Sequence, residues 1–438
     1  MNIGLDARTV FSPRPRGTGR NLFDAYRLMP TLRPTWTFTL YHQREARECA
    51  LLRNSGASSG YDAGGVYGSE SSNQKSRGLQ PARPSAEHAD PATANQDVRL
   101  WPANVRTRRL TLRGDRFDAW FQLALPWAAW RDGVDLLHFP ANAAPACCPV
   151  PYVVTIHDLI PLKIAEELPP RARRRFQRGI ARAVRRAVHI ITPSRATRDD
   201  LCADFRVAPE RITVIPWAPD RAIGGDGARR DPLAQEALRT RYQLERPWLL
   251  NFSGGGHRKN ATALLRAFAQ LAPQWRQQYQ LVLVGCESSR RAALEALATE
   301  LGIAADCRVL GFVSHEDLPG LLRGARGLLM PSLYEGFGLP ILDAFACGVP
   351  VLTSDRSSMP EVAGDAAVYC DPMSPASIAA GIAELLRDDV AERLVRRGGE
   401  RVRAYTWEAT ARAMCAVYEL ALAQVPHARR AGEVATCR

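Results

Sequence analysis

Two series of short apolar runs, each alternating with helical segments, constrain what this chain can fold into. In the first half, the runs Asp135–Phe139, Tyr152–Ile156 and His189–Pro193 are compact and typical of buried strands. The alternation restarts at Trp248–Phe252 and continues through the second half. Because strands that alternate with helices form parallel sheets covered on both faces, we expect an α/β protein with two Rossmann-like domains. Such sheets bind ligands at the carboxyl ends of their strands, so the two domains should face a central cleft.

Changes in composition predict the domain boundaries. At 438 residues the chain is long enough for two cores. We expect an N-terminal domain over residues 1–218, a linker rich in Gly, Pro and charge over 219–242, and a C-terminal domain over 243–404. Residues 53–97 contain few large apolar side chains and predict a disordered insertion. A last apolar helix over 405–425 should pack back across the interface.

The charge distribution narrows the possible partners. The formal net charge is +13, and its densest block is the arginine-rich stretch 171–190. Phe176 and Ile180 fall on one helical face of this stretch, so it could be a solvated surface helix packed on a sheet. The alternative is attraction to anionic membrane lipid or to a polyanionic acceptor. Nucleic acid is disfavoured as a partner, since no recognised binding motif accompanies the charge.

The sequence predicts a cytoplasmic protein, with a peripheral position at the inner membrane face as a variant of that prediction. The first residues, MNIGLDARTV, carry charges where the apolar core of a signal peptide would lie. The longest uncharged apolar run, 140–156, is interrupted by prolines and is too short to cross a bilayer. The ten cysteines form no C-x-x-C pair, which indicates a reduced chain without a disulfide framework or zinc site.

The motif EGFGLPILD carries the strongest functional signal. Glu335 lies in a turn after an apolar run, Gly336 and Gly338 let the backbone approach a ligand, and a helix should begin at about Leu339. That helix N-terminus would present N–H groups to anionic oxygens, while Glu335 and Asp343 would accept hydrogen bonds from hydroxyls. A nucleotide-sugar offers both kinds of group. The alternative is an ordinary glycine turn with acidic residues that stabilise the helix dipole.

A second glycine-rich motif, SGGGHRKN, places Arg258 and Lys259 just before a predicted helix. Two cations beside a helix N-terminus suit a diphosphate leaving group, although a glycine turn with a basic cap would look the same. The chain has neither the phosphate loop of nucleoside triphosphatases nor a D-x-D triplet. We therefore expect no metal and no cofactor, with the two cations neutralising the diphosphate.

The first domain contributes weaker signals. His157 comes directly after a buried strand, where it could donate a hydrogen bond to a phosphate or a sugar hydroxyl, or could simply be structural. His138 has a similar position and is interpreted as pocket lining. Gly17, Thr18 and Gly19 form a glycine-bearing turn between a strand and a helix that could face the same cleft from the acceptor side.

Taken together, HRKN, YEGFGLPILDAFACGVPV and the HDL of the first half resemble glycosyltransferase family 4, whose members are retaining enzymes of GT-B fold. The resemblance implies that Arg258 and Lys259 bind the donor diphosphate. It further implies that Glu335 contacts the transferred sugar. The backbone of Gly336, Phe337, Gly338 and Leu339 would lie beside that sugar.

The resemblance also assigns the remaining donor contacts. Asp343 would hold the ribose, Val313 would lie near the base, and His157 would stand across the cleft by the sugar. Two positions depart from the family pattern. The family usually has glutamate at the position of Asp343, and many members have an arginine directly after Gly254, where this chain has another glycine.

The function implied is that of a retaining hexosyltransferase, with Glu335, His157 and Lys259 as its catalytic residues. The motifs look most like mannosyltransferases of surface polysaccharide pathways, so GDP-mannose is the first expectation for the donor and UDP-sugars are the second. The expected acceptor is a growing glycan, plausibly lipid-linked. The alternatives are a nucleotide-sugar epimerase or a phosphorylase with the same cleft, and a non-catalytic protein that binds a glycan or polyanion.

Overall fold

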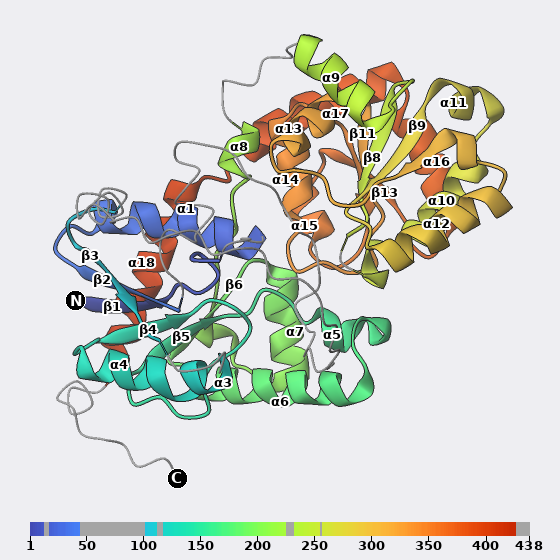
Figure 1. Ribbon diagram of the computed structural model, residues 1–438. Coiled ribbons are helices and arrows are strands. Elements are labelled where there is room, and N and C mark those ends of the chain that lie inside the picture. The colour runs from blue at the N-terminus through green and yellow to red at the C-terminus, as the bar shows by residue number, and fades with distance from the viewer. Residues whose placement is uncertain (13–16, 44–100, 112–116, 225–231, 255, 426–438) are drawn as a thin grey trace, which may run out of the picture.

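The computed structural model describes residues 1–12, 17–43, 101–111, 117–224, 232–254 and 256–425 (Figure 1). These residues form two α/β domains, each built on its own parallel sheet. The two-domain architecture predicted from the alternating pattern is therefore confirmed. The predicted insertion at 53–97 lies outside the described residues.

The N-terminal sheet has seven strands in the order β3-β2-β1-β4-β5-β6-β7. All its pairings are parallel. The strands are β1 (Asn2–Asp6), β2 (Thr37–His42), β3 (Val105–Arg109), β4 (Leu136–Phe139), β5 (Tyr152–Thr155), β6 (His189–Thr192) and β7 (Ile212–Val214).

Helices cover both faces of this sheet. The helical elements are α1 (Gly17–Leu32), α3 (Phe117–Ala119), the π-helix η4 (Trp120–Ala124), α4 (Leu125–Arg131), α5 (Ile160–Lys163), η5 (Ala165–Glu167), α6 (Pro170–Arg186), α7 (Arg195–Phe205), η6 (Pro209–Arg211) and α8 (Arg221–Gly224). Phe176 and Ile180 of α6 are buried in a core that also contains Trp120 and Leu125. The helical spacing of Phe176 and Ile180 therefore marks the face of α6 that packs on the sheet. This agrees with the interpretation of the stretch as a surface helix packed on a sheet.

The C-terminal sheet has six parallel strands in the order β10-β9-β8-β11-β12-β13. Its strands are β8 (Trp248–Phe252), β9 (Gln280–Val284), β10 (Cys307–Val309), β11 (Gly327–Met330), β12 (Val351–Ser354) and β13 (Ala367–Cys370). Its helices are α9 (Pro232–Tyr242), η7 (His257–Lys259), α10 (Ala261–Ala269), α11 (Pro273–Gln278), α12 (Ser288–Glu300), η8 (Ala304–Asp306), α13 (Asp317–Gly324), α14 (Leu339–Ala346), α15 (Met359–Ala363), α16 (Pro375–Leu385) and α17 (Asp388–Val402).

Two segments join the domains. Part of the predicted linker forms α9, which packs on α13 of the C-terminal domain, and Gln235 of α9 donates a hydrogen bond to the carbonyl of Gly320 at 2.9 Å. The last helix, α18 (Trp407–Ala423), lies against α1 of the N-terminal domain. Tyr418 of α18 is fully buried, and its hydroxyl is 2.8 Å from Nδ1 of His138. His138 therefore takes part in the contact with α18.

Two further observations bear on the environment of the chain. None of the helices in the described ranges has both the length and the apolar character that crossing a bilayer requires. Among the residues that the structure describes, the cysteines at positions 148, 202, 286, 307, 347, 370 and 415 are free thiols.

Candidate active site

Glu335 lies between two cations at the carboxyl end of the C-terminal sheet. It follows the buried strand β11 in the turn that leads to α14. Its Oε1 accepts a hydrogen bond from Arg258 Nη1 at 2.6 Å and lies 2.8 Å from Lys259 Nζ. The side chains of Glu335 and Lys259 are each only 9% exposed. The structure thus brings together the three residues that the two glycine motifs predicted, although Glu335 lies 76 positions after Lys259 in the sequence.

The charges of this trio do not cancel. Burial alone would raise the pKa of Glu335, but the charges of Arg258 and Lys259 hold it below its ordinary value. Burial lowers the pKa of Lys259, and this outweighs the attraction of Glu335. The pKa of Lys259 is therefore lowered mainly by burial, and that of Glu335 by the two cations that face it. Taken by itself the trio carries one excess positive charge, but Glu167 and Asp158 of the other domain are close enough for their charges to interact with Lys259 and Arg258.

The glycine loop before these cations packs against the first domain. Gly256 has a φ of +93°, and a Cβ built on it would collide with the carboxylate of Glu167. That carboxylate, in η5 of the N-terminal domain, accepts a hydrogen bond from the backbone N–H of Arg258 at 2.9 Å. The φ of Gly256 favours glycine, and the absence of a side chain there leaves room for the carboxylate of Glu167. Sequence reasoning missed Glu167, since no motif surrounds it.

Gly336 makes one of the close contacts between the domains. A Cβ at Gly336 would overlap the carbonyl oxygen of His157 and lie 2.7 Å from Cβ of Asp158. Close backbone approach was the role expected of this glycine, but the neighbour in the structure is the other domain. The adjacent Tyr334 also crosses the junction, because its hydroxyl donates to a carboxylate oxygen of Asp200 in α7.

The start of α7 supplies partners for this contact that the sequence analysis did not identify. Ser194 Oγ donates to the carbonyl of Gly336 at 2.7 Å, and Thr197 Oγ1 donates to the same carbonyl at 3.2 Å. Glu361 of the C-terminal domain accepts from the backbone N–H of Arg195 at 2.8 Å. The sequence does mark Ser194 as a helix N-cap, and its hydroxyl accepts from Thr197 N, but the pattern does not show its partner in the other domain.

The turn that carries Glu335 is held rigidly. Ser358 Oγ contacts the carbonyl oxygens of Glu335 and Phe337 at 2.9 and 2.8 Å. Phe337 is buried and packs edge-on against Tyr405, with ring centroids 6.2 Å apart, so its side chain is part of the core. Gly338 has a φ of +108°, which an L-residue rarely adopts, and it caps α14, which begins at Leu339 as predicted.

His157 lies at the carboxyl end of β5, and one of its two ring nitrogens is already hydrogen-bonded within the protein. Its Nε2 is 2.6 Å from the carbonyl oxygen of Pro140, which can only accept. Burial lowers the pKa of His157 to about 4, so the ring is neutral at pH 7 with its proton on Nε2. The remaining nitrogen, Nδ1, can then only accept a hydrogen bond. Donation to a phosphate therefore does not fit this tautomer, whereas acceptance from a sugar hydroxyl does. Trp217 stacks on the ring, with centroids 5.7 Å apart.

Asp343 lies beneath the segment that joins the domains. Its Oδ1 accepts a hydrogen bond from the backbone N–H of Asp220 at 3.0 Å. Burial, with a smaller contribution from the charge of Asp220, raises the pKa of Asp343 to about 8. Val313 is buried in the loop after β10, and the nearby His315 lies 3.5 Å from Asp220. The donor-binding residues predicted from the sequence thus have different surroundings, because Glu335 contacts the two cations and Asp343 contacts Asp220.

The glycines predicted for the acceptor side lie at the start of a helix. Gly17, Thr18 and Gly19 form the first turn of α1. The next residue, Arg20, is close enough to His315 of the C-terminal domain for its charge to lower the pKa of that histidine, in addition to the effect of burial. Arg20, which directly follows these three residues, therefore lies near His315 of the C-terminal domain.

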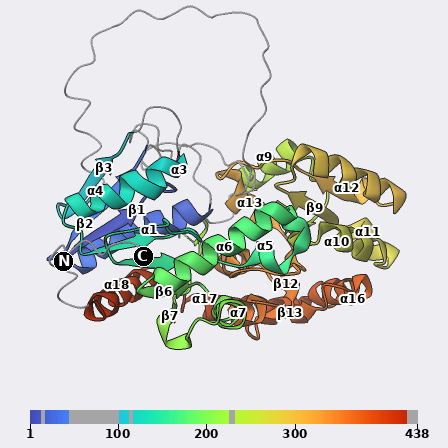
Figure 2. The ribbon, with the colours of Figure 1, turned by 90° about the horizontal axis from the view of Figure 1, so that it is seen from below.

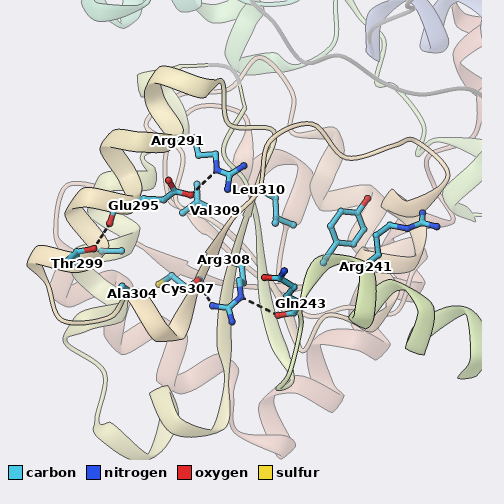
Figure 3. Close-up of a pocket in the computed structure, with 12 residues that line it drawn as sticks. Arg241, Gln243, Arg291, Glu295, Thr299, Ala304, Cys307, Arg308, Val309 and Leu310 are labelled. Atoms are coloured by element: carbon cyan, nitrogen blue, oxygen red, sulfur yellow. Dashed lines mark hydrogen bonds and ion pairs between the residues drawn. The ribbon is translucent and has the colours of Figure 1, made fainter.

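A hollow of about 380 Å³ in the C-terminal domain lies apart from these residues (Figure 3). It is lined by parts of α12, β10 and the end of α9, and it includes the ion pair of Arg291 with Glu295 at 2.8 Å. None of the site residues predicted from the sequence lines it. We do not assign it to the active site.

The chemistry open to the site follows from its groups. Arg258 and Lys259 can neutralise a departing diphosphate, Glu335 can accept from a sugar hydroxyl, and His157 Nδ1 can accept from another. In the ranges that the structure describes, no group of three or more His, Cys, Asp or Glu side chains is arranged to hold a metal ion.

This chain is similar to known families and individual proteins of glycosyltransferases. The model of glycosyl transferases group 1 matches residues 236–402, and the model of Glycosyltransferase Family 4 matches residues 81–221. O-antigen chain mannosyltransferase B of Escherichia coli is 33% identical over 258 residues, which cover 58% of this chain and 67% of that protein. The MMP alpha-(1->4)-mannosyltransferase of Mycolicibacterium hassiacum is 30% identical, covering 56% of this chain and 57% of that protein. The D-inositol 3-phosphate glycosyltransferase of Corynebacterium jeikeium is 30% identical, covering 65% and 69%.

Solved structures agree over almost the whole chain. Sucrose-phosphate synthase from Thermosynechococcus elongatus has a TM-score of 0.64 at 19% identity and covers 97% of this chain and 100% of its own. The glycosyltransferase WaaG has a TM-score of 0.62 at 16% identity, covering 95% and 99%. HepE of Anabaena, solved with UDP and glucose, has a TM-score of 0.62 at 18% identity, covering 96% and 100%. At these identities the structures establish the fold, which is GT-B. The family models and the curated relatives show that this chain belongs to glycosyltransferase family 4.

Proposed function

We propose that this protein is a retaining glycosyltransferase that moves a hexose from a nucleoside-diphosphate sugar to a growing surface glycan. The observation that carries the proposal is the position of Glu335 between Arg258 and Lys259, at the junction of the two domains. Two cations here lie beside a carboxylate that can accept hydrogen bonds from sugar hydroxyls. A diphosphate linked to a sugar matches both features.

The proposed reaction begins with departure of the diphosphate. The bond between the anomeric carbon and the diphosphate oxygen breaks, and Arg258 and Lys259 stabilise the charge that develops on that oxygen. The acceptor hydroxyl attacks the anomeric carbon from the same face, and its proton passes to the departing phosphate oxygen. Glu335 and the Nδ1 of His157 orient the sugar by accepting hydrogen bonds from its hydroxyls. The anomeric configuration is thereby retained.

Mannose is our first choice for the transferred sugar, with GDP-mannose as the donor. Two relatives described above are named mannosyltransferases, one of O-antigen chains, which supports both the sugar and a surface-glycan acceptor. A UDP-sugar is the second choice, because HepE was solved with UDP and glucose. The assignment of Asp343 to the ribose and of Val313 to the base belongs to this proposal. It requires the donor to reach the segment near Asp220. The first turn of α1, at Gly17, Thr18 and Gly19, is proposed for the acceptor side.

We further propose that the protein works in the cytoplasm, on an acceptor that is lipid-linked at the inner membrane face. The exposed arginines of α6 support a peripheral contact with anionic lipid.

A thermal-shift screen tests the proposal first. The protein is heated with GDP, UDP, ADP and their sugars, with and without EDTA. A ligand at a hundred times its dissociation constant stabilises by about 2.7 kcal/mol. We expect a shift with one nucleotide family that EDTA does not change. The transfer assay with that donor should then require an acceptor, since turnover without one would indicate an epimerase. No shift with any nucleotide would overturn the proposed function.

A further inference from the structure

The outer surface of the N-terminal domain contains a strongly basic hollow, far in sequence from the donor motifs. It has a volume of about 480 Å³ and lies between α6, α7 and η6. Five arginines line it, namely Arg178, Arg182, Arg185, Arg206 and Arg211, and Phe205 contributes to an apolar wall.

These arginines lack carboxylate partners. The lining of the hollow contains no acidic residue, and no ion pair joins any of the five to a carboxylate in the part of the chain that the structure describes. Elsewhere the arginines commonly have such partners, as in the pair of Arg246 and Asp306 at 3.0 Å. Arg211 is fixed because its Nη2 donates to the carbonyls of Val184 and Ala187 at the end of α6. Like charges held together without counter-ions repel one another, so this hollow favours an anion.

An exposed apolar stripe lies on the neighbouring helices. Leu123, Trp127 and Trp130 are 68%, 53% and 43% exposed. They follow one another at spacings of four and three residues along η4 and α4, so they share one side of that continuous helical segment. Large aromatic side chains in such a stripe are costly to leave in water and are typical of surfaces that meet a partner or the headgroup level of a membrane.

The stripe and the hollow belong to the same layer of the domain. Figures 1 and 2 both show α4 and α6 side by side on one face of the N-terminal sheet. Arg175 of α6 lies 3.8 Å from Asp118 of α3. Arg186 donates to the carbonyl of Ala146, whose N–H donates to Gln122 Oε1 of η4 at 2.6 Å. The helical segments that carry the stripe and the hollow are therefore linked to each other on this face of the domain.

We propose that this surface, formed by the arginine hollow and the stripe of Leu123, Trp127 and Trp130, binds the face of an anionic lipid membrane. The guanidinium groups would hold lipid phosphates, and the tryptophans would lie among the headgroups. Arginine suits phosphate because its planar donors match two phosphate oxygens, and the apolar wall beside the hollow suits the rest of the lipid. A free phosphate or diphosphate would satisfy the arginines but would leave the stripe without a partner. This inference deepens the proposed function, since it names the surface through which a lipid-linked acceptor would be reached.

Vesicle co-sedimentation tests the inference without any donor present. The full chain is mixed with phosphatidylcholine vesicles that either contain or lack phosphatidylglycerol, at low and at physiological salt. We expect binding only with the anionic lipid and weaker binding at higher salt. Equal binding to both kinds of vesicle, or binding to neither, would overturn the inference.

Variants locate the surface. R182E/R185E should weaken binding by roughly ten-fold or more, and R182Q/R185Q should do so to a smaller degree if the stronger change impairs folding. W127A/W130A should also weaken binding, with the salt dependence retained. The matched control is R396E/R403E, which changes the same charge on exposed arginines at α17 in the other domain. If the control loses as much affinity as R182E/R185E, net charge and not this surface is responsible, and the inference fails.

Two readouts separate the possible failures. Pyrophosphate is titrated against the protein in a calorimeter, and it is also added to vesicle-bound protein. Tight binding of pyrophosphate that depends on Arg182 and Arg185, without any vesicle binding, would assign the hollow to a free anion and overturn the lipid assignment. The nucleotide thermal shift is measured on the same variants. A shift retained in R182E/R185E shows that the variant folds. If the wild type shows no shift with any nucleotide but still binds vesicles, the proposed function is overturned and the membrane inference is not.

Discussion

The hydroxyl of Ser194 donates a hydrogen bond to the carbonyl oxygen of Gly336 at 2.7 Å, and so joins the start of α7 to the turn that carries Glu335. Ser194 is completely buried, and it lies 142 positions from Gly336 in the sequence. The geometry of the candidate active site therefore depends on a residue of the other domain.

Ser194→Ala should reduce both stability and activity. The change removes the bond to Gly336 and an N-cap, each worth on the order of 1 kcal/mol. Thermal denaturation and the kcat/KM for donor measure the two effects. Ser374→Ala is the matched control, because Ser374 caps α16 in the same way through Ser377 N at 3.2 Å. We expect the control to lose stability but to keep its kcat/KM. Equal loss of activity in both variants would show that the bond to Gly336 has no role of its own.

Gly336→Ala should impair catalysis by separating the domains. The added methyl would overlap the carbonyl oxygen of His157, which is backbone and cannot turn away. We expect kcat/KM to fall by roughly a hundred-fold, since a displacement of about 1 Å can cost that much. Gly399→Ala is the control, because Gly399 lies in α17 with open space around its Cβ position. That variant should be active and as stable as the wild type or slightly more so. A fully active Gly336→Ala enzyme would contradict the domain contact described here.

Lys259→Ala should lower the rate of transfer by roughly one to two orders of magnitude, equivalent to about 1.5–3 kcal/mol of lost stabilisation of the leaving group. The variant leaves Glu335 with Arg258 as its remaining cation, so the excess positive charge of the trio disappears. Single-turnover rates with saturating donor measure the effect. Arg403→Ala, an exposed residue at the end of α17, serves as the control. Near-normal turnover in Lys259→Ala would exclude the proposed leaving-group role.

Asp343 should make stability depend on pH. Its pKa is raised from an ordinary value of 3.8 to about 8, mainly by burial. The folded state therefore holds a proton that the unfolded state has already released. The resulting stabilisation is complete below the unfolded pKa and is lost as the pH rises through about 8. Asp24 and Asp158, whose pKa values burial raises to about 6, act in the same direction at lower pH.

Urea denaturation between about pH 6 and pH 9 measures this dependence, expressed as the free energy of unfolding. We expect it to decrease with pH in the wild type and to decrease less in Asp343→Asn, which cannot ionise. Asp389→Asn is a control, because Asp389 is exposed and its ordinary pKa of 3.8, which lies below this range, is lowered further by Arg387. Identical slopes in the wild type and Asp343→Asn would show that Asp343 is already ionised in the folded protein.

The sequence by itself determined the two sheets and the main charged residues of the site. Short apolar runs such as Leu328–Met330 and Val351–Thr353 appear as buried strands because hydrophobic periodicity is a local property. The turns that follow strands in parallel sheets converge on one edge, so HRKN and EGFG could be expected to meet. Arg258, Lys259 and Glu335 do so.

The tertiary structure alone decided how each of these groups is used. Gly336 accommodates the backbone of His157, and Glu167 binds the amide of Arg258, because the two domains pack against each other at these points. Asp343 receives its hydrogen bond from Asp220, in the segment that joins the domains. Contacts of this kind link residues up to about 140 positions apart and depend on distances of a few ångströms. No local pattern of residues encodes them, since they arise only when both cores have formed and meet.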